Sequence, residues 1–129
     1  MVDWLKVLVE CAQNMKGAVI PLFGTSEARE EFGRGAGGDI KKRIDLAAED
    51  ALIQTLKKHN ASCTLISEEA GVKQIGANSS GFYVVADPVD GTANAARGLP
   101  FADISLAVSK KPMLSGVEVA VVADVMRDF

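Results

Sequence analysis

The sequence has few cysteine, histidine and aromatic residues. Its 129 residues include two cysteines, one histidine and 5% aromatic side chains. The cysteines, Cys11 and Cys63, lack the C-x-x-C spacing of a zinc site, and two thiols do not make a disulfide framework in a chain of this size. We therefore expect both to be small buried hydrophobic residues in a reducing compartment. We expect His59 to be a charge near a helix end rather than a metal ligand.

The sequence also lacks long apolar runs and an excess of positive charge. No apolar run reaches the roughly 18 residues that span a bilayer, and no basic stretch followed by a hydrophobic core opens the chain. We expect no membrane partner and a cytoplasmic location. The net charge of −3 disfavours binding to nucleic acid. The 48% of hydrophobic residues is sufficient to fill a globular core.

Apolar residues recur at helical spacing over two segments. Val2–Phe23 has one apolar face, which predicts a long amphipathic helix ending near Pro21. Ile40–His59 repeats the pattern and predicts a second helix. Between them, the glycine-rich segment Gly33–Gly38 is expected to be a mobile loop or plain linker, and Asp39 could cap the second helix.

Four β-type runs follow the predicted helices. They are Cys63–Ile66, Gly81–Ala86, Phe101–Ser109 and Val117–Val125. Two helices followed by four strands predict an α+β fold in which two long helices pack on one face of a largely antiparallel sheet. A chain of this length is expected to form a single domain over residues 1–129.

The stretch D-P-V-D-G-T, residues 87–92, is the first candidate site. Its two carboxylates lie at the end of an apolar strand and converge if the chain turns, which Pro88 and Gly91 would permit. Hard cations such as Mg²⁺ take carboxylate and carbonyl oxygens, and the carbonyl of Val89 lies between the two acids. Residues 92–98 predict a short helix whose free N–H groups could hold phosphate. The alternative is a surface turn, since Asp, Pro and Gly are turn formers.

Two further acidic positions precede this stretch. Glu68 and Glu69 directly follow the apolar strand that ends near Ile66, and their alternative interpretation is a solvated turn. Asp45 lies in the first part of the predicted second helix, where the alternative is an exposed helix charge.

Together these segments resemble the inositol monophosphatase superfamily, which also contains fructose-1,6-bisphosphatases. The family signature D-P-[hydrophobic]-D-G-[T/S], followed by a helix with an asparagine, matches residues 87–92 and Asn94. The family's upstream Glu-Glu pair matches Glu68 and Glu69, and its helical aspartate matches Asp45.

The resemblance implies a set of metal ligands. Glu68, Asp87 and the carbonyl of Val89 would hold one Mg²⁺ ion, and Asp87 and Asp90 would share a second. The segment Gly33–Gly38 matches the family's mobile catalytic loop, which helps to organise a third ion.

The resemblance also implies roles in catalysis and in binding. Asp45 and Thr92 would hydrogen-bond the attacking water and help to deprotonate it. The backbone N–H groups of Gly91 and Thr92, together with Asp90, would bind the phosphate of the substrate. Glu69 could be a supporting carboxylate or an alternate ligand.

The expected function is Mg²⁺-dependent hydrolysis of phosphate monoesters of inositol or sugars. Inositol 1-phosphate and fructose 1,6-bisphosphate are the leading substrates by resemblance, and family members usually form homodimers. This hydrolysis is among the slowest uncatalysed reactions, and metal ions can activate the water and stabilise the leaving oxygen.

The sequence departs from the family in two ways. It resembles the amino-terminal half of the family's layered αβαβα fold, so we expect a truncated metal-binding domain without the carboxyl-terminal substrate domain, which supplies another aspartate ligand. The alternative function is therefore a non-catalytic metal- or phosphate-binding fragment, or half of a split assembly. Ser67 also replaces a glycine that is common in the family.

Overall fold

The computed structural model describes residues 2–22, 25, 31–34, 40–68, 71–76, 81–90, 103–111 and 116–125. The helices are α1 (Trp4–Val19), the 3₁₀ turn η1 (Ile20–Leu22) and α2 (Arg43–Lys58). The strands are β1 (Glu31–Arg34), β2 (Ile40–Lys42), β3 (Cys63–Ser67), β4 (Gly71–Ile75), β5 (Tyr83–Asp90), β6 (Asp103–Ser109) and β7 (Val117–Asp124).

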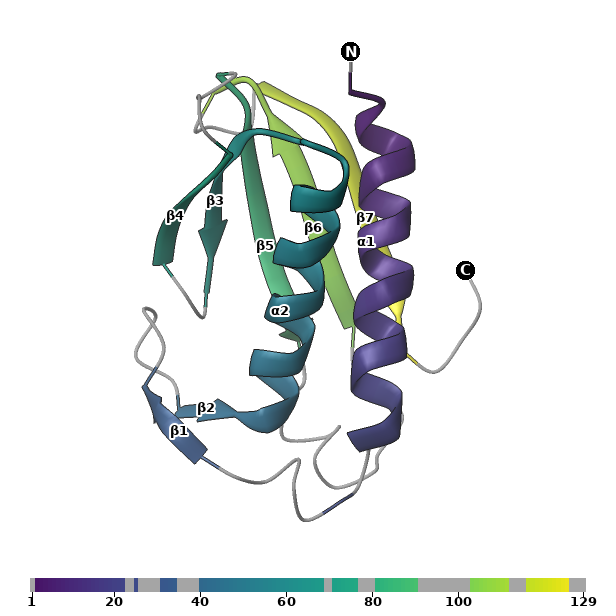
Figure 1. Ribbon diagram of the computed structural model, residues 1–129, viewed down its shortest axis with the longest axis vertical. Helices are drawn as coiled ribbons and strands as arrows, with labels where there is room; N and C mark the ends of the chain where they lie inside the picture. The colour runs from purple at the N-terminus through teal and green to yellow at the C-terminus, as the bar shows by residue number, and fades with distance from the viewer. Residues whose placement is uncertain are drawn as a thin grey trace.

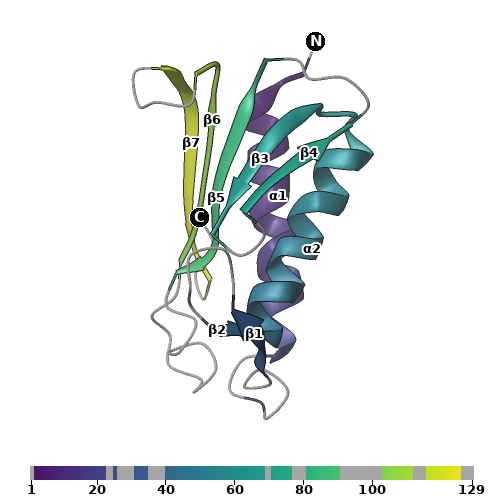
Figure 2. The same ribbon diagram turned by 90° about the vertical axis from the view of Figure 1, so that its left-hand side faces the viewer.

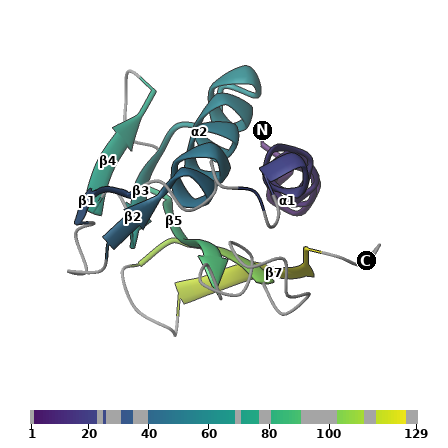
Figure 3. The same cartoon turned by 90° about the horizontal axis from the view of Figure 1, so that it is seen from below.

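The molecule has two layers, one of helices and one of strands. The main sheet has the order β4-β3-β5-β6-β7, with β3 and β5 parallel and the other neighbours antiparallel. The helices α1 and α2 run in opposite directions, side by side, on one face of this sheet (Figures 1 and 2). The view from below shows both helices on the same side of β5 and β7 (Figure 3). The expected α+β fold is confirmed.

The core lies between the helices and the inner face of the sheet. Each helix buries one stripe, as the spacing of apolar residues predicted, and the residues that are completely buried include Leu8, Met15, Leu52 and Leu56. Asp3 caps α1, because its side chain accepts a hydrogen bond from the backbone N–H of Lys6 at 3.2 Å. Both cysteines are free and buried, as expected. Neither described helix has the length and hydrophobicity of a membrane-spanning helix.

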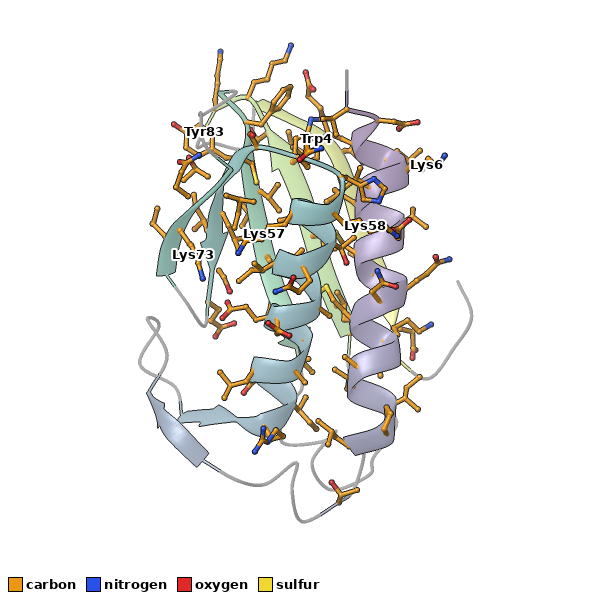
Figure 4. The ribbon with its side chains drawn as sticks, viewed as in Figure 1. Trp4, Lys6, Lys57, Lys58, Lys73 and Tyr83 are labelled. Atoms are coloured by element: carbon orange, nitrogen blue, oxygen red, sulfur yellow. The ribbon has the colours of Figure 1, made fainter. Side chains whose placement is uncertain are left out.

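Polar contacts also join the two helices. His59, just after α2, contacts Glu10 of α1 with 2.8 Å between ring Nε2 and carboxylate Oε2, and Lys58 donates to the same oxygen at 3.3 Å. Figure 4 shows Lys58 on the side of α2 nearer α1. Asn14 donates to the Thr55 hydroxyl at 2.9 Å, which adds a second tie between the helices. His59 therefore acts in this part of the fold as a partner of Glu10.

Two predicted boundaries were wrong. The second helix begins at Arg43 rather than Ile40, because residues 40–42 pair with β1 as strand β2 instead of continuing the helical spacing. Gly33 and Arg34 belong to β1 rather than to a loop. The remainder of the glycine-rich segment and Asp39 lie outside the described residues.

The predicted number of strands was also wrong. β4 was missed because three of its five residues are exposed, which gives it little apolar alternation. Gly71 and Gly76, at φ 74° and 87°, lie at its ends in a backbone region that favours glycine. The main sheet therefore has five described strands rather than four.

The outer face of the sheet carries an apolar row. Register aligns Val72, Ile66, Val85, Ala107 and Ala120 across all five strands. Val72 is 72% exposed, so part of this row faces solvent in the described structure. The outer face thus combines apolar side chains with the polar groups of the candidate site.

Candidate functional site

Glu68 directly follows β3, and Asp87 lies at the matching position of the neighbouring parallel strand β5. The last paired residues of β3 and β5 are Ser67 and Ala86, and the backbone N–H of Glu68 donates to the carbonyl of Ala86 at 3.3 Å. Neighbouring strands are about 4.8 Å apart, and alternation directs Glu68 and Asp87 to the same face. Both residues line one pocket of about 610 Å³ on the outer face, next to Val85.

A tight hairpin turn places Glu68. Ser67 pairs with Gly71 at the end of the antiparallel β3–β4 ladder, so residues 68–70 form the connection. Gly71 has φ 74°, which a glycine adopts without strain and which closes short hairpins of this kind. Glu68 is exposed at the first position of this turn. Glu69, the second acidic residue, lies outside the described residues.

A β-bulge, rather than the expected sharp turn, shapes the aspartate motif. β5 continues through Asp90, and its pairing with β6 shifts from Asp87–Ser105 to Asp90–Asp103. Between these two pairs β5 advances by three residues and β6 by only two, so β5 contains one extra residue, which defines a bulge. The burial pattern agrees, because the inward-facing positions Ala86 and Val89 are three residues apart instead of two.

Asp45 is buried near the start of α2. It is the third residue of that helix and 2% exposed, so its interpretation as an exposed helix charge is wrong. A carboxylate in the first turn is favoured by the helix dipole. Asp45 does not belong to the pocket lining that includes Glu68 and Asp87, because α2 covers the opposite face of the sheet. Even so, β3 and β5 both run toward the end of the molecule from which α2 begins (Figure 1).

One turn further along α2, Glu49 makes a contact that the sequence interpretation missed. Its carboxylate accepts a hydrogen bond of 2.6 Å from the hydroxyl of Ser67, and both side chains are buried. The signal for Glu49 was its spacing, four residues after Asp45 and three before Leu52, which places it on the buried stripe of α2.

The donors at this pocket are hard oxygen ligands. Mg²⁺ is usually held by one or two carboxylates, with waters and substrate phosphates completing its coordination. Glu68 and Asp87 fit that requirement by type and by position. Within the described part of the chain, no three acidic, histidine or cysteine side chains are close enough to form a complete metal cluster.

Several predicted residues cannot be placed. Gly91, Thr92 and Asn94 lie outside the described residues, and for Asp90 the backbone alone is described. The structure therefore brings together Glu68 and Asp87, leaves Val89 buried in the bulge between the two aspartates of the motif, and places Asp45 in the helix layer. The catalytic and ligand roles of all these residues stay predictions.

Comparison with known protein families gives one match over nearly the whole chain. The model of the inositol monophosphatase family matches residues 1–128. A relative from Methanothermobacter thermautotrophicus, named fructose-1,6-bisphosphatase/inositol-1-monophosphatase, is 43% identical over 84% of this chain and 39% of its own length. A bifunctional NADP phosphatase/NAD kinase from Methanococcus maripaludis is 39% identical over 84% of this chain and 19% of its own length.

Solved structures agree with the sequence relatives. The crystal structure of an inositol monophosphatase–fructose 1,6-bisphosphatase is 28% identical and superposes with a TM-score of 0.80, covering 97% of this chain and 46% of that protein. The chain therefore spans less than half the length of these relatives.

Proposed function

Because the chain belongs to the inositol monophosphatase family, we propose that it is the metal-binding part of a Mg²⁺-dependent phosphatase that hydrolyses phosphate monoesters of inositol or sugars. The observation that carries this proposal is the pair Glu68, directly after β3, and Asp87 of the adjacent parallel strand β5, which line one pocket. The chain continues from β5 directly into the rest of the D-P-V-D-G-T motif. The register of the two strands and the family motif therefore point to the same place.

The proposed metal ligands are oxygen donors from β3 and β5. Glu68, Asp87 and the carbonyl of Val89 would hold one ion, and Asp87 and Asp90 would hold a second. When bound, Mg²⁺ supplies positive charge for the phosphoryl oxygens and lowers the pKa of bound water. The bulge between Asp87 and Asp90 supports this assignment, since bulges re-aim the backbone and side chains next to active sites.

The remaining proposed roles concern the water and the phosphate. Asp45 and Thr92 would orient the attacking water by hydrogen bonds, and the carboxylate of Asp45 would accept its proton. The N–H groups of Gly91 and Thr92 would hold phosphate oxygens, as free N–H groups at a helix start do. Glu69 would support the ligand carboxylates. We also propose a cytoplasmic homodimer, which sedimentation and cell fractionation would check.

The alternative is a non-catalytic fragment or half of a split assembly. The chain covers less than half the length of the relatives named above. Under this alternative the chain binds Mg²⁺ through Glu68 and Asp87 but releases no phosphate by itself. The phosphatase and the non-catalytic fragment would share one metal site, and only the phosphatase would release phosphate.

One assay separates these possibilities. Phosphate release from inositol 1-phosphate, fructose 1,6-bisphosphate and NADP is measured with and without Mg²⁺, together with Mg²⁺ binding by calorimetry. Asp87→Asn is expected to lower both activity and Mg²⁺ affinity by more than about 100-fold, because it removes a ligand shared by two ions. Asp50→Asn, on an exposed position of α2, is the matched control and should change neither.

Each outcome decides between the alternatives. Mg²⁺-dependent turnover that Asp87→Asn abolishes supports the phosphatase. Mg²⁺ binding without turnover, again lost in Asp87→Asn, supports the non-catalytic fragment. If Mg²⁺ neither binds nor promotes turnover, or if Asp87→Asn behaves like Asp50→Asn, the proposed site is wrong.

A further inference from the structure

A buried hydrogen bond ties α2 to β3 beside the candidate site. The Ser67 hydroxyl donates to a carboxylate oxygen of Glu49 at 2.6 Å. Ser67 is 4% and Glu49 is 8% exposed, so the pair is almost completely removed from water. A distance of 2.6 Å is typical of a hydroxyl bonded to a carboxylate, which is stronger than a hydrogen bond between neutral groups.

The two partners each stand next to a residue with a proposed role. Ser67 directly precedes Glu68, and its hydroxyl bonds to Glu49 in the helix layer, while both Ser67 and Glu68 belong to the lining of the pocket on the other face. Glu49 lies one helical turn after Asp45, on the same buried side of α2. The bond therefore connects the backbone that carries a proposed ligand with the helix that carries the proposed water-binding carboxylate.

The backbone that places Glu68 begins at the end of β3. Glu68 is exposed, it stands at the first position of a hairpin turn, and its N–H donates to Ala86 at 3.3 Å. A ligand on a turn is held in place by its neighbours, and supporting hydrogen bonds of this kind orient metal ligands. Anchoring the preceding side chain limits the rotation of the turn around Glu68.

We propose that the Ser67–Glu49 hydrogen bond is a positioning device that fixes Glu68 for metal binding and fixes β3 against α2. This inference rests on the proposed function, because it takes Glu68 as a ligand. Ser67 and Glu49 act through Glu68 and do not themselves touch the ion.

The test compares three serine variants of the whole chain. Ser67→Ala removes the hydroxyl, and Ser67→Thr keeps it. Ser109→Ala is the matched control, because Ser109 is an equally buried strand serine that bonds to the backbone of Lys111. Ser109 pairs with Tyr83 at the start of β5, whereas Asp87 lies at its other end. The dissociation constant for Mg²⁺ is measured by calorimetry, and the melting temperature is measured without metal.

Ser67→Ala is expected to raise the Mg²⁺ dissociation constant by about 10-fold, the lower end of effects from supporting hydrogen bonds. Ser67→Thr and Ser109→Ala should stay within about 2-fold of the parent chain. Both Ser67→Ala and Ser109→Ala should lower the melting temperature, and Ser67→Ala should lower it more, because it takes a donor from the buried carboxylate of Glu49. A purely structural role would affect melting and leave Mg²⁺ affinity unchanged.

The failure of this inference differs from the failure of the proposed function. If the parent chain binds Mg²⁺, Asp87→Asn does not, and Ser67→Ala binds as tightly as the parent, the positioning role is overturned while the metal site stands. If Ser109→Ala weakens binding as much as Ser67→Ala, the effect is general destabilisation and the inference is also overturned. If the parent chain binds no Mg²⁺, both the site and this inference fall together.

Discussion

At the scale of single residues, Glu10 is the carboxylate with the clearest electrostatic environment. Its pKa is lowered from the ordinary value of 4.5, chiefly by the hydrogen bond with His59; desolvation, the second-largest effect, opposes this, and the hydrogen bond from Lys58 adds to the lowering. A carboxyl group whose pKa is lower in the folded state stabilises the fold above its unfolded pKa. That contribution is lost as the pH falls through the lower, folded value.

We therefore predict that Glu10→Gln destabilises the chain at about pH 6 and has a smaller effect as the pH falls below 4.5. The measurement is urea unfolding of both proteins across this range. Glu118→Gln is the control, because Glu118 meets Lys110 at 3.5 Å in a more exposed pair and should matter less. If the difference in unfolding free energy between parent and Glu10→Gln grew as the pH fell, the stabilising role of the ionised Glu10 carboxylate would be contradicted.

The pKa values of the two cysteines differ from that of Glu10 in their cause, because burial rather than a charged partner has the largest effect on them. Burial raises the pKa of Cys63 to about 11, and burial together with the negative charge of Glu10 raises the pKa of Cys11 to about 12. The thiolate is the reactive form of cysteine, and it is scarce at neutral pH under these conditions.

We predict that neither thiol reacts with a disulfide reagent at about pH 8 in the folded chain, and that both react after denaturation. The measurement is the release of chromophore over time, with the chain in strong denaturant as the reference for two thiols. Reaction in the native state should follow the rate of unfolding. Rapid labelling of one thiol without unfolding would show that the reagent reaches that thiol in the folded chain.

At the scale of elements, α1 shows how burial decides the energetic weight of an apolar residue. Leu8 and Leu5 lie on the same helix, three residues apart, yet Leu8 is fully buried against the core and Leu5 is 55% exposed. Truncating a buried leucine loses both its transfer free energy and the packing around the cavity.

We predict that Leu8→Ala lowers the free energy of unfolding by about 2–5 kcal/mol. Leu5→Ala, which makes the same chemical change on the same helix, should cost less than about 1 kcal/mol. Denaturant titration measures both, and the slope with denaturant should be unchanged in each variant. Equal losses in the two variants would mean that α1 does not pack as described.

The sequence predicted these elements unevenly, and the reasons are physical. The two helices follow from apolar spacing, because burial of one stripe requires it. Strand β4 was not predicted, because most of its side chains are exposed. The bulge in β5 was not predicted either, because it depends on pairing with β6. Asp45 and Glu49 share the spacing of the buried stripe of α2, but acidic side chains are usually exposed, so their burial is evident only with the sheet beneath the helix.

The candidate site was predictable to a similar extent. The motif suggested that the acids of β3 and β5 meet, and the parallel register places Glu68 and Asp87 at one pocket. The contribution of Ser67 was not visible, because a hydrogen bond between residues 18 positions apart depends on how α2 lies on β3. Local sequence patterns identify donors, whereas packing between layers decides which of them support one another.

At the scale of the whole molecule, the two faces of the sheet have different roles. The inner face packs against α1 and α2 and contributes to the core. The outer face presents Glu68 and Asp87 beside exposed apolar residues such as Val122, which is 65% exposed. Metal binding at this face would be linked to the stability of the fold, because only the folded chain brings Glu68 and Asp87 to one pocket.

We predict that Mg²⁺ stabilises the fold by mass action, because the unfolded chain does not hold Glu68 and Asp87 together. At a free concentration of about 100 times the dissociation constant, the free energy of unfolding should rise by about 2.7 kcal/mol. Thermal unfolding at increasing Mg²⁺ measures this, with sodium chloride at equal ionic strength as the control for general screening. Asp87→Asn should lose the Mg²⁺ effect, because it removes a proposed ligand. Equal stabilisation of parent and variant by Mg²⁺ would place the bound ion elsewhere on the molecule.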